Sequence, residues 1–412
     1  MRIDKLSISD NIARKKLLSA KEVEVAYVEN IEDFSSLWSQ VAPSNNIFFD
    51  TGYLKVLESQ PPEGVSFGYL LFLKESKLVG CANLQIQYFK AKSNIRYEDA
   101  PKQGFFRTLG KFFRNLVASA VEFHILVCGN MCITGEHGFY FRPGEFKPKM
   151  ELKVLDEGLN FAQEQLRRKG ISVAGNLIKE FYDQNHPYSN ILCKLGYHEF
   201  QVQPNMVLAN VDRWETFDDY LANITSKYRT RYKRARKKAK SLSKKEFSLE
   251  DLHENIDTLY SLYRNIADNS GFNLVNLNKD YLLEFKTKMP AEFRVFAYYQ
   301  EDQIVGFYST IKNHDELEAH FIGFEPLVNR ETQIYLNMLY DMLADAIEVN
   351  AKQVVYARTA MEIKSSVGAE GIEMHCYLKH ANHFTNHLLP SILDLLKPTK
   401  DWKPRNPFPT SS

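Results

Sequence analysis

The polar residues best placed for chemistry lie in one short stretch of the second half of the chain. Residues 357–378 read ARTAMEIKSSVGAEGIEMHCYL, which predicts a strand end, a short helix, a glycine turn and a returning strand. Arg358, Thr359, Glu362 and Lys364 stand where strand gives way to helix, the edge at which open α/β sheets collect ligand groups. Glu362 and Lys364 do not share a helical face, as an ordinary surface pair would. We therefore interpret these four side chains as substrate-binding.

Glu318 and His320 are candidates for proton transfer. They belong to the predicted strand 317–324, LEAHFIGF, where alternation places Glu318, His320 and Ile322 on one face. A carboxylate or imidazole aimed into a cleft could remove the proton from an amine nucleophile, a role worth roughly 10²- to 10⁴-fold in rate. A Glu and His pair satisfied inside the protein would give the same pattern, so both interpretations stay open.

Two tyrosines complete this candidate site. Tyr377, on the last predicted strand, could protonate a leaving thiolate or orient an acceptor, although most strand tyrosines are simply half-buried. Tyr335 stands near the start of an apolar helix predicted from Thr332 to Asn350. Helix N-termini attract anions and carbonyl oxygens, so Tyr335 is expected to face a ligand.

A run of positive charge precedes these elements. Residues 227–245 contain eleven Lys or Arg and no acid, with Tyr228 and Tyr232 on one helical face. A solvated helix face is one interpretation. The other is a site for a phosphate-rich ligand such as coenzyme A, a nucleotide-linked sugar, tRNA or an anionic headgroup, in which Arg makes bidentate contacts and Tyr offers a stacking face. The anion-binding candidates are Arg229, Arg231, Lys233 and Arg234.

Composition limits the class of protein. At 412 residues, 44% apolar and 25% charged, the chain suits two globular domains, and a net charge of +1 gives no overall field for nucleic acid or lipid. Five cysteines suit free thiols in a reducing cytoplasm, and the Cys128-x-x-x-Cys132 spacing lacks a second pair for a metal, so no metal is expected. The start of the chain lacks the apolar run of a signal peptide, and we expect a soluble, cytoplasmic protein. Residues 105–123 form a basic amphipathic segment that could pack on a domain or make peripheral membrane contact.

The two halves repeat one order of elements. The segment KESKLVGCANLQI in the first half resembles YQEDQIVGFYSTI in the second, and Gly80 aligns with Gly306. We therefore expect an α/β protein of two tandem copies, each a mixed central sheet flanked by helices. The predicted domains are residues 1–210 and 211–396, with 397–412 as a mobile Pro-rich tail. Motifs for dinucleotides, P-loops and α/β-hydrolases are missing.

The order of elements and a few motifs resemble a known family. Trp214-x-x-Phe217-x-x-Tyr220-x-x-x-Ile224, the Gly306-Phe307 pair and RTAMEIKSSVGA look like tandem GNAT-fold proteins. Within them the chain is similar to the bacterial acetyltransferase-like branch related to Fem-type peptidoglycan aminoacyltransferases. The resemblance implies acyl transfer to an amine in a cleft where two parallel strands splay apart, with amides of the earlier strand as an oxyanion site. It carries over these site candidates: Glu318, His320, Tyr335, Arg358, Glu362 and Lys364.

One departure concerns the donor. The family's coenzyme A loop, Gln/Arg-x-x-Gly-x-Gly/Ala, is replaced by GFEPLVNR at residues 323–330, where a proline and an acid leave fewer amides for a pyrophosphate. Three readings remain open. The first is an N-acyltransferase, N-acetyltransferase-like, that uses acyl-coenzyme A on a small-molecule or cell-envelope amine. The second is a Fem-like aminoacyltransferase that uses charged tRNA, and the third is a non-catalytic binding protein of the same fold.

Overall fold

The computed structural model describes residues 12–90, 122–182, 188–269, 275–396 and 402–409. Nearly all of the basic amphipathic segment predicted at 105–123 lies outside these residues. None of the helices in the described ranges is both long enough and apolar enough to cross a membrane. The chain divides into two compact units, which consist of residues 1–202 with 373–399 and residues 203–372 with 400–412.

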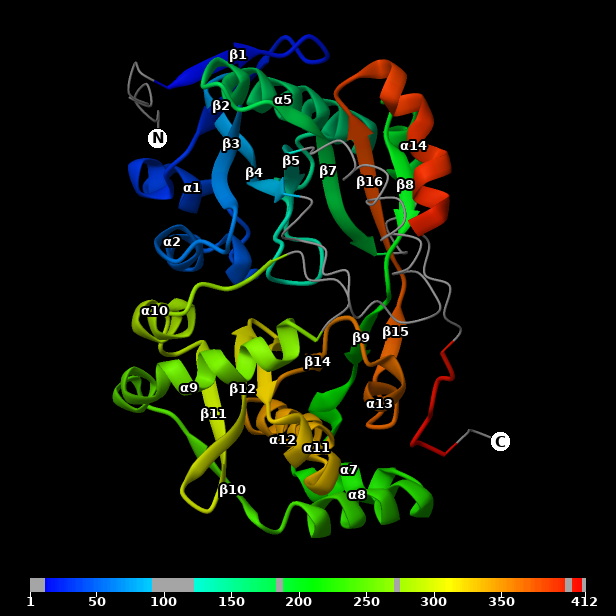
Figure 1. The fold of residues 1–412 in the computed structure, drawn as a ribbon. Helices are drawn as coiled ribbons and strands as arrows, with labels where there is room; N and C mark the ends of the chain where they lie inside the picture. Colours follow the sequence, from blue (N-terminus) through cyan, green and yellow to red (C-terminus); the bar gives the residue numbers. More distant parts are fainter. Residues whose placement is uncertain (1–11, 91–121, 183–187, 270–274, 397–401, 410–412) are drawn as a thin grey trace. The chain divides into compact units, whose positions relative to one another are not determined.

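Unit 1 is a mixed sheet flanked by helices, as expected (Figure 1). Helix α5 crosses the sheet and packs on β2, β3, β5 and β7, while α1 packs on β4. Its strands are β1 (Ala13–Lys16), β2 (Val23–Val28), β3 (Val65–Lys74), β4 (Lys77–Lys90), β5 (Glu122–Cys128), β6 (Phe139–Phe141), β7 (Val173–Tyr182), β8 (His198–Gln201) and β16 (Met374–His380). Its helices are η1 (Ile31–Phe34), α1 (Ser35–Val41), η2 (Ile47–Phe49), α2 (Thr51–Ser59), α5 (Pro148–Arg168), α6 (Ser189–Lys194) and α14 (His383–Leu396).

Unit 2 repeats this architecture. Helices α9 and α12 both pack on β12 and β13, and the main apolar core lies on the α12 side. Its strands are β9 (Asn205–Leu208), β10 (Leu242–Glu246), β11 (Phe293–Gln300), β12 (Gln303–Asn313), β13 (Glu316–Phe324), β14 (Gln353–Val355) and β15 (Glu370–Ile372). Its helices are η4 (Val211–Arg213), α7 (Phe217–Asn223), α8 (Ser226–Lys238), α9 (Leu249–Ala267), α10 (Tyr281–Lys288), α11 (Pro326–Thr332), α12 (Ile334–Glu348) and α13 (Met361–Ser365).

The two sheets exchange one strand each. The order is β2-β3-β4-β5-β7-β16-β8 in unit 1, after the edge strand β1, and β10-β11-β12-β13-β14-β9-β15 in unit 2. The last but one strand of each sheet therefore comes from the other half of the sequence. Apart from this exchange, the strands and helices follow one another in the same order in both units, so the chain holds two tandem copies of one α/β fold.

The exchange explains a difference from the predicted domains. We placed the boundary at residues 210 and 211, whereas the division falls between Val202 and Gln203, and residues 373–396 belong to unit 1 instead of unit 2. The alternation of apolar and polar residues along a strand shows which of its faces is buried. It does not show to which of the two sheets the strand belongs, so the exchange could not be predicted from this pattern.

The end of the chain also differs from its predicted mobility. Within the described residues 402–409, Trp402 and Phe408 pack against the core of unit 2, and Thr225 N donates to Pro407 O at 2.8 Å. The ring of Phe408 stacks on Trp214, 6.0 Å between centroids. The prediction of mobility was based on the prolines of this segment. The aromatic rings of Trp402 and Phe408 instead fix it to unit 2.

The segment before β10 contains two helices. Helix α7 begins with a capping box between Thr216 and Asp219 and ends at Asn223, and Ile224 follows in an extended conformation, buried in the core. Helix α8 then begins at Ser226. The break lets α8 start in a new direction.

Candidate functional site

Strands β13 and β14 of unit 2 separate partway along β13, and we call this point of separation the crevice. The two strands pair in parallel only from Glu316 to Glu318, opposite Gln353 to Val355. Strand β13 continues to Phe324, and beyond Glu318 the described residues pair it with β12 alone. Glu318 is thus the last residue of β13 that pairs with β14, at the carboxyl end of β14, where ligands of open α/β sheets bind.

A β-bulge shapes β13 directly beyond Glu318. Tyr308 pairs with Ile322 and Thr310 pairs with Ala319, so Ser309 alone faces His320 and Phe321. The Ser309 hydroxyl fills the bulge, because it accepts a hydrogen bond from Phe321 N at 3.1 Å and lies 3.3 Å from His320 Nδ1. The prediction that Ile322 shares a face with Glu318 and His320 was wrong. The extra residue turns Ile322 toward the core cluster around α12.

His320 lies in a box of aromatic rings. Tyr281, Phe285, Phe293 and Phe321 surround the imidazole, with centroid distances of 4.4 to 5.8 Å. Its Nε2 lies 3.2 Å from the Tyr281 hydroxyl, so both ring nitrogens have partners. Burial lowers the pKa of His320 to about 3. The ring is therefore neutral at physiological pH and takes up a proton only reluctantly, which weakens its candidacy as a general base.

Glu318 has the opposite tendency. Its side chain is buried, and its neighbours across the two ladders are the apolar Ile311 and Val355. Burial, together with the nearby charge of Glu316, raises the pKa of Glu318 well above its ordinary value. A carboxyl whose pKa moves toward neutrality is suited to proton transfer.

The turn after β14 is strained. Ala357, Thr359 and Ala360 have left-handed φ values of 57°, 68° and 46°, which cost on the order of 1–3 kcal/mol each for residues other than glycine. The turn is held by Lys364, which is buried and donates to Ala357 O at 3.1 Å and Arg358 O at 2.6 Å. Burial, with a contribution from Arg358, lowers the pKa of Lys364 to about 7. Lys364 thus supports the turn from beneath, while Arg358 is half-buried and Thr359 exposed on it.

The remaining substrate-binding candidates are distributed around this turn. Glu362 is exposed and pairs with Arg405 at 3.2 Å. Tyr335 is half-buried and its ring stacks on Phe324, 5.8 Å between centroids. Burial raises the pKa of Tyr335. The Tyr335 side chain therefore packs at the start of α12, beside the end of β13.

Tyr377 is not brought together with Glu318 and His320. It lies on β16, in the exchanged strand, and is enclosed in the core of unit 1 against Phe181, 5.3 Å between centroids. Sequence order suggested the opposite, because β16 follows the elements of unit 2 directly.

Unit 1 has a matching position without the same residues. Its parallel pairing ends at Cys128 and Ile178, and two residues later Glu180 has a left-handed φ of 59°, as Ala357 has after Val355. Lys179 and Glu180 form a buried ion pair of 2.6 Å. Lys179 donates to Ile133 O, and Glu180 accepts from Gly135 N, both in the loop that follows β5. Charges that are already paired with each other fasten this loop.

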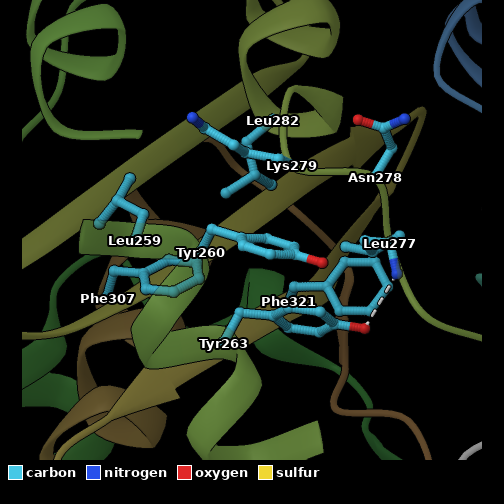
Figure 2. Close-up of a pocket in the computed structure, with 9 residues that line it drawn as sticks. All are labelled: Leu259, Tyr260, Tyr263, Leu277, Asn278, Lys279, Leu282, Phe307 and Phe321. Carbon is cyan, nitrogen blue, oxygen red and sulfur yellow. Dashed lines mark hydrogen bonds between the residues drawn. The ribbon is translucent and has the colours of Figure 1, made fainter. Parts of the chain in front are cut away.

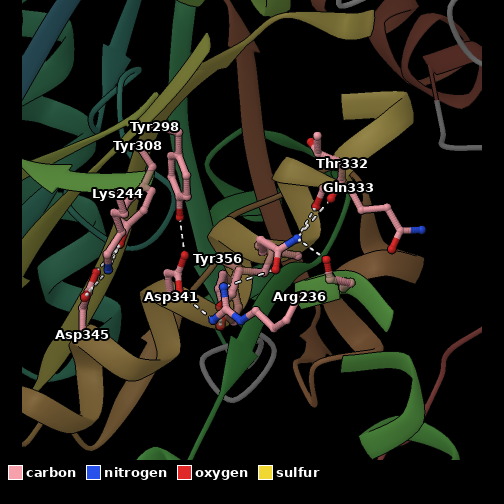
Figure 3. A network of polar contacts seen from close by, with 12 residues as sticks. Arg236, Lys244, Tyr298, Tyr308, Thr332, Gln333, Asp341, Asp345 and Tyr356 are labelled. Carbon is pink, nitrogen blue, oxygen red and sulfur yellow. Dashed lines mark hydrogen bonds and ion pairs between the residues drawn. The ribbon is translucent and has the colours of Figure 1, made fainter. Parts of the chain in front are cut away.

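The basic run on α8 has two different faces. Arg229 donates to carbonyl oxygens at the end of α7, including Ile224 O, and Arg231 is half-buried. Arg236 and Lys244 are neutralised by α12, through Asp341 at 2.6 Å and Asp345 at 3.3 Å (Figure 3). Lys245 pairs with Asp251 at 2.6 Å. Six other exposed cations make no ion pair with the residues that the structure describes: Lys227, Lys233, Arg234, Lys237, Lys238 and Lys240.

Figure 2 shows a pocket with an aromatic lining that includes Phe321, a residue of the bulge. Tyr260, Tyr263, Phe307 and Phe321 line it from α9, β12 and β13, together with Leu259, Leu277, Asn278, Lys279 and Leu282. The Tyr263 hydroxyl accepts a hydrogen bond from Leu277 N at 3.2 Å and so ties the segment before α10 to α9. The only cation in this lining is Lys279, which pairs with Asp257 on α9.

The end of β13 fits a coenzyme A pyrophosphate poorly. The groove there is lined by Asn265, Ile266, Asn269, Phe324 and Pro326, without a cation. Glu325 N donates to Val305 O, and Pro326 has no N–H. Tyr335 N is taken by Asn329 Oδ1 at 3.1 Å. Few amides at this position are therefore left for a phosphate. The carboxylate of Glu325, which accepts a hydrogen bond from Asn265 of the groove, would repel it.

Several residues that lie close to Glu318 and His320 were not predicted from the sequence. Ser309 and Tyr281 touch His320. Glu316 interacts with Glu318 and accepts a hydrogen bond from Gln353. The bulge is invisible in the alternation of β13, and Tyr281 lies far from the strand in sequence. Glu316 could have been found, because it precedes Glu318 by one full strand period.

Comparison with known proteins finds a family model that matches part of unit 2. Residues 226–365 match the family model described as an acetyltransferase (GNAT) domain. Among curated proteins, none matches the sequence significantly.

Similar solved structures include FemX and a tandem GNAT protein from the clavulanic acid pathway. FemX is 11% identical over 89% of this chain and 99% of its own, with a TM-score of 0.49. The clavulanic acid pathway protein is 10% identical over 87% and 99%, with the same TM-score of 0.49. L-PGS from Bacillus licheniformis is 11% identical over 84% and 95%, with a TM-score of 0.44. At these identities the likeness concerns the fold alone.

Proposed function

We propose, on the premise that residues 226–365 form a GNAT acetyltransferase domain within a tandem α/β chain, that this protein transfers an acyl group to an amine. The observation that supports it most is Glu318, a buried carboxyl at the point where β13 and β14 separate. A family of acyltransferases provides the reaction class, and this residue provides a group for the proton that must move.

The residues around the crevice then have distinct roles. Glu318 exchanges a proton with the reacting groups. Arg358 and Thr359 meet the substrate from the strained turn, which Lys364 holds in place. The Ser309 hydroxyl fixes the bulge, so the backbone of β13 beyond Glu318 keeps one geometry toward the acyl carbonyl.

Acyl-coenzyme A is the first donor to test, with a small or cell-envelope amine as acceptor. The groove at the end of β13 gives its pyrophosphate little support, so binding would depend on the rest of the donor. Unit 1 would then serve as a structural or acceptor-binding copy.

A second candidate is aminoacyl transfer from charged tRNA. It is favoured by the exposed cations of α8, for which the structure provides no acidic partner among its described residues. Binding through phosphates would weaken steeply with salt. The third candidate is a binding protein of the same fold that has no catalytic activity.

A thermal-shift series on the purified protein tests these readings. The ligands are acetyl-coenzyme A, longer acyl-coenzyme A thioesters, free coenzyme A and bulk tRNA, and a ligand at 100 times its Kd stabilises the fold by about 2.7 kcal/mol. A shift with a thioester, followed by amine-dependent release of free thiol that Glu318→Gln abolishes, supports the first proposal. A salt-sensitive shift with tRNA alone supports the second. Binding without turnover for every donor would refute acyl transfer.

A further inference from the structure

Two carboxyl groups of β13 share a hydrogen bond. Glu316 and Glu318 are one strand period apart, so their side chains lie on the same face. Glu318 is 4% exposed and Glu316 is half-buried. The charge of Glu316 and the hydrogen bond between the two groups raise the pKa of Glu318. The same hydrogen bond lowers the pKa of Glu316. Two carboxylates on one strand face repel each other when both are ionised, which favours a pair that holds one proton.

The donors around the pair indicate which carboxyl keeps that proton. Glu316 accepts a hydrogen bond from the side-chain amide of Gln353, on β14, and another from Asn313 Nδ2 at 3.5 Å. Amide donors favour an ionised acceptor. Glu318 also interacts with Asn313 but is otherwise flanked by Ile311 and Val355. The better-solvated, better-bonded Glu316 is therefore the carboxylate, and Glu318 donates to it.

Among the described residues, the charge of Asp315 also acts on this pair, because it raises the pKa of Glu316. The next side chain on the same face is His320, which is neutral inside its aromatic box. Asp315, at the turn before β13, is engaged by Lys352 at 2.6 Å. Neither the β12 nor the β14 neighbour of Glu318 carries a charge.

We propose that Glu318 is a carboxylic acid at neutral pH, held and kept protonated by Glu316 as its positioning residue, and that it acts on the leaving group as a proton donor. This inference rests on the proposed acyl transfer for its role in the reaction. As the amine nitrogen forms its bond to the acyl carbon, the bond from that carbon to the leaving sulfur or oxygen breaks. The departing atom takes the proton of Glu318, and the resulting carboxylate recovers a proton from the acceptor nitrogen.

The protonation state can be measured without any substrate. Infrared difference spectra of the full chain at pH 7 should contain the carbonyl stretch of a buried carboxylic acid that Glu318→Gln removes. In Glu316→Gln the same band should disappear at lower pH than in the wild type, because the neighbouring negative charge is gone. Glu362→Gln, an exposed acid near the same crevice, should leave the band unchanged. Circular dichroism confirms that each variant is folded.

The outcomes separate the two proposals. A band absent at pH 7, or one that survives Glu318→Gln, overturns the assignment even if acyl transfer is found. A band that behaves as expected in a protein without transfer supports the assignment of the proton and refutes the proposed function. If transfer is found, Glu316→Gln should shift the pH profile of kcat to lower pH, whereas a purely structural role would leave the profile in place.

Discussion

Lys364 Nζ lies 2.6 Å from the carbonyl oxygen of Arg358, inside the turn that carries Arg358 toward the crevice. The same ammonium group donates to Ala357 O at 3.1 Å. A buried charge thus collects two carbonyl oxygens of a backbone with three left-handed residues other than glycine. Together with the bond that Ala357 O accepts from Met206 N at 3.2 Å, these bonds hold the strained conformation.

We expect Lys364→Met to loosen this turn. Ala357 O and Arg358 O would lose the bonds from Lys364, while Ala357 O would keep its bond from Met206 N at 3.2 Å. We expect a cost of about 1–3 kcal/mol, although the relief of burying an amino group offsets part of it. Trypsin cleavage after Arg358 should become faster under native conditions, as measured by mass spectrometry of the fragments. Lys240→Met, an exposed change just after α8, is the control. Equal cleavage rates in the two variants would contradict the role of Lys364.

His320 should make the protein sensitive to acid. Its pKa is about 3 in the folded protein and about 6.5 in an unfolded chain. Between these values the unfolded state binds a proton that the folded state does not, so the free energy of unfolding falls as pH falls from about 6.5 to 3, by up to about 1.4 kcal/mol per pH unit. Urea titrations of the wild type and His320→Phe should show a shallower acid slope in the variant. Parallel slopes would argue against a buried neutral imidazole.

The strand exchange predicts that the two halves fold only together. A fragment of residues 1–210 lacks β16, and a fragment of residues 211–412 lacks β9, so each sheet would have a gap before its last strand. Expressed alone, each should show weak near-ultraviolet circular dichroism, and mixing should restore a native spectrum. A single chain that joins residues 12–202 to 373–396 by a flexible linker is the matched control, and it should fold by itself. Independent folding of the two simple fragments would contradict the exchange.

Gly323 should not tolerate a side chain. A Cβ atom there would lie 2.5 Å from Leu262 C and 2.6 Å from Tyr263 N, both in the backbone of α9. Gly323→Ala must push α9 away from β13, at a cost of about 1–3 kcal/mol or more. The decrease should appear in the urea midpoint. Thr258→Ala, at an exposed position of α9, should change stability by less than about 0.5 kcal/mol.

The ion pair of Asp341 should matter more than a surface pair. Asp341→Asn leaves Arg236 and the Tyr298 hydroxyl without their carboxylate, a partly buried arrangement that we expect to cost about 2–4 kcal/mol. Asp315→Asn removes an exposed pair with Lys352 and should cost less than about 1 kcal/mol. Equal losses in thermal or urea denaturation would show that the network in Figure 3 is only a surface feature.

The sequence was sufficient for the α/β class, the two copies and most elements, because hydrophobic periodicity and glycine turns are local. Gly196, for example, ends α6 with a φ of 90°, as its place in the sequence indicates. The site was harder to predict, since its geometry depends on contacts between distant segments. The bulge opposite Ser309, the aromatic box around His320 and the position of Tyr377 in unit 1 all depend on such contacts.

The exchange of β9 and β16 also affects how the chain is made. Unit 1 contains β7 and β8, which leave the ribosome long before Met374 begins the strand that lies between them. At a synthesis rate of about 5–20 residues per second, this interval lasts roughly ten to thirty seconds. During that time the nascent chain exposes two unpaired strand edges, a ready target for aggregation. Chaperone binding to the growing polypeptide should therefore persist until the last part of translation.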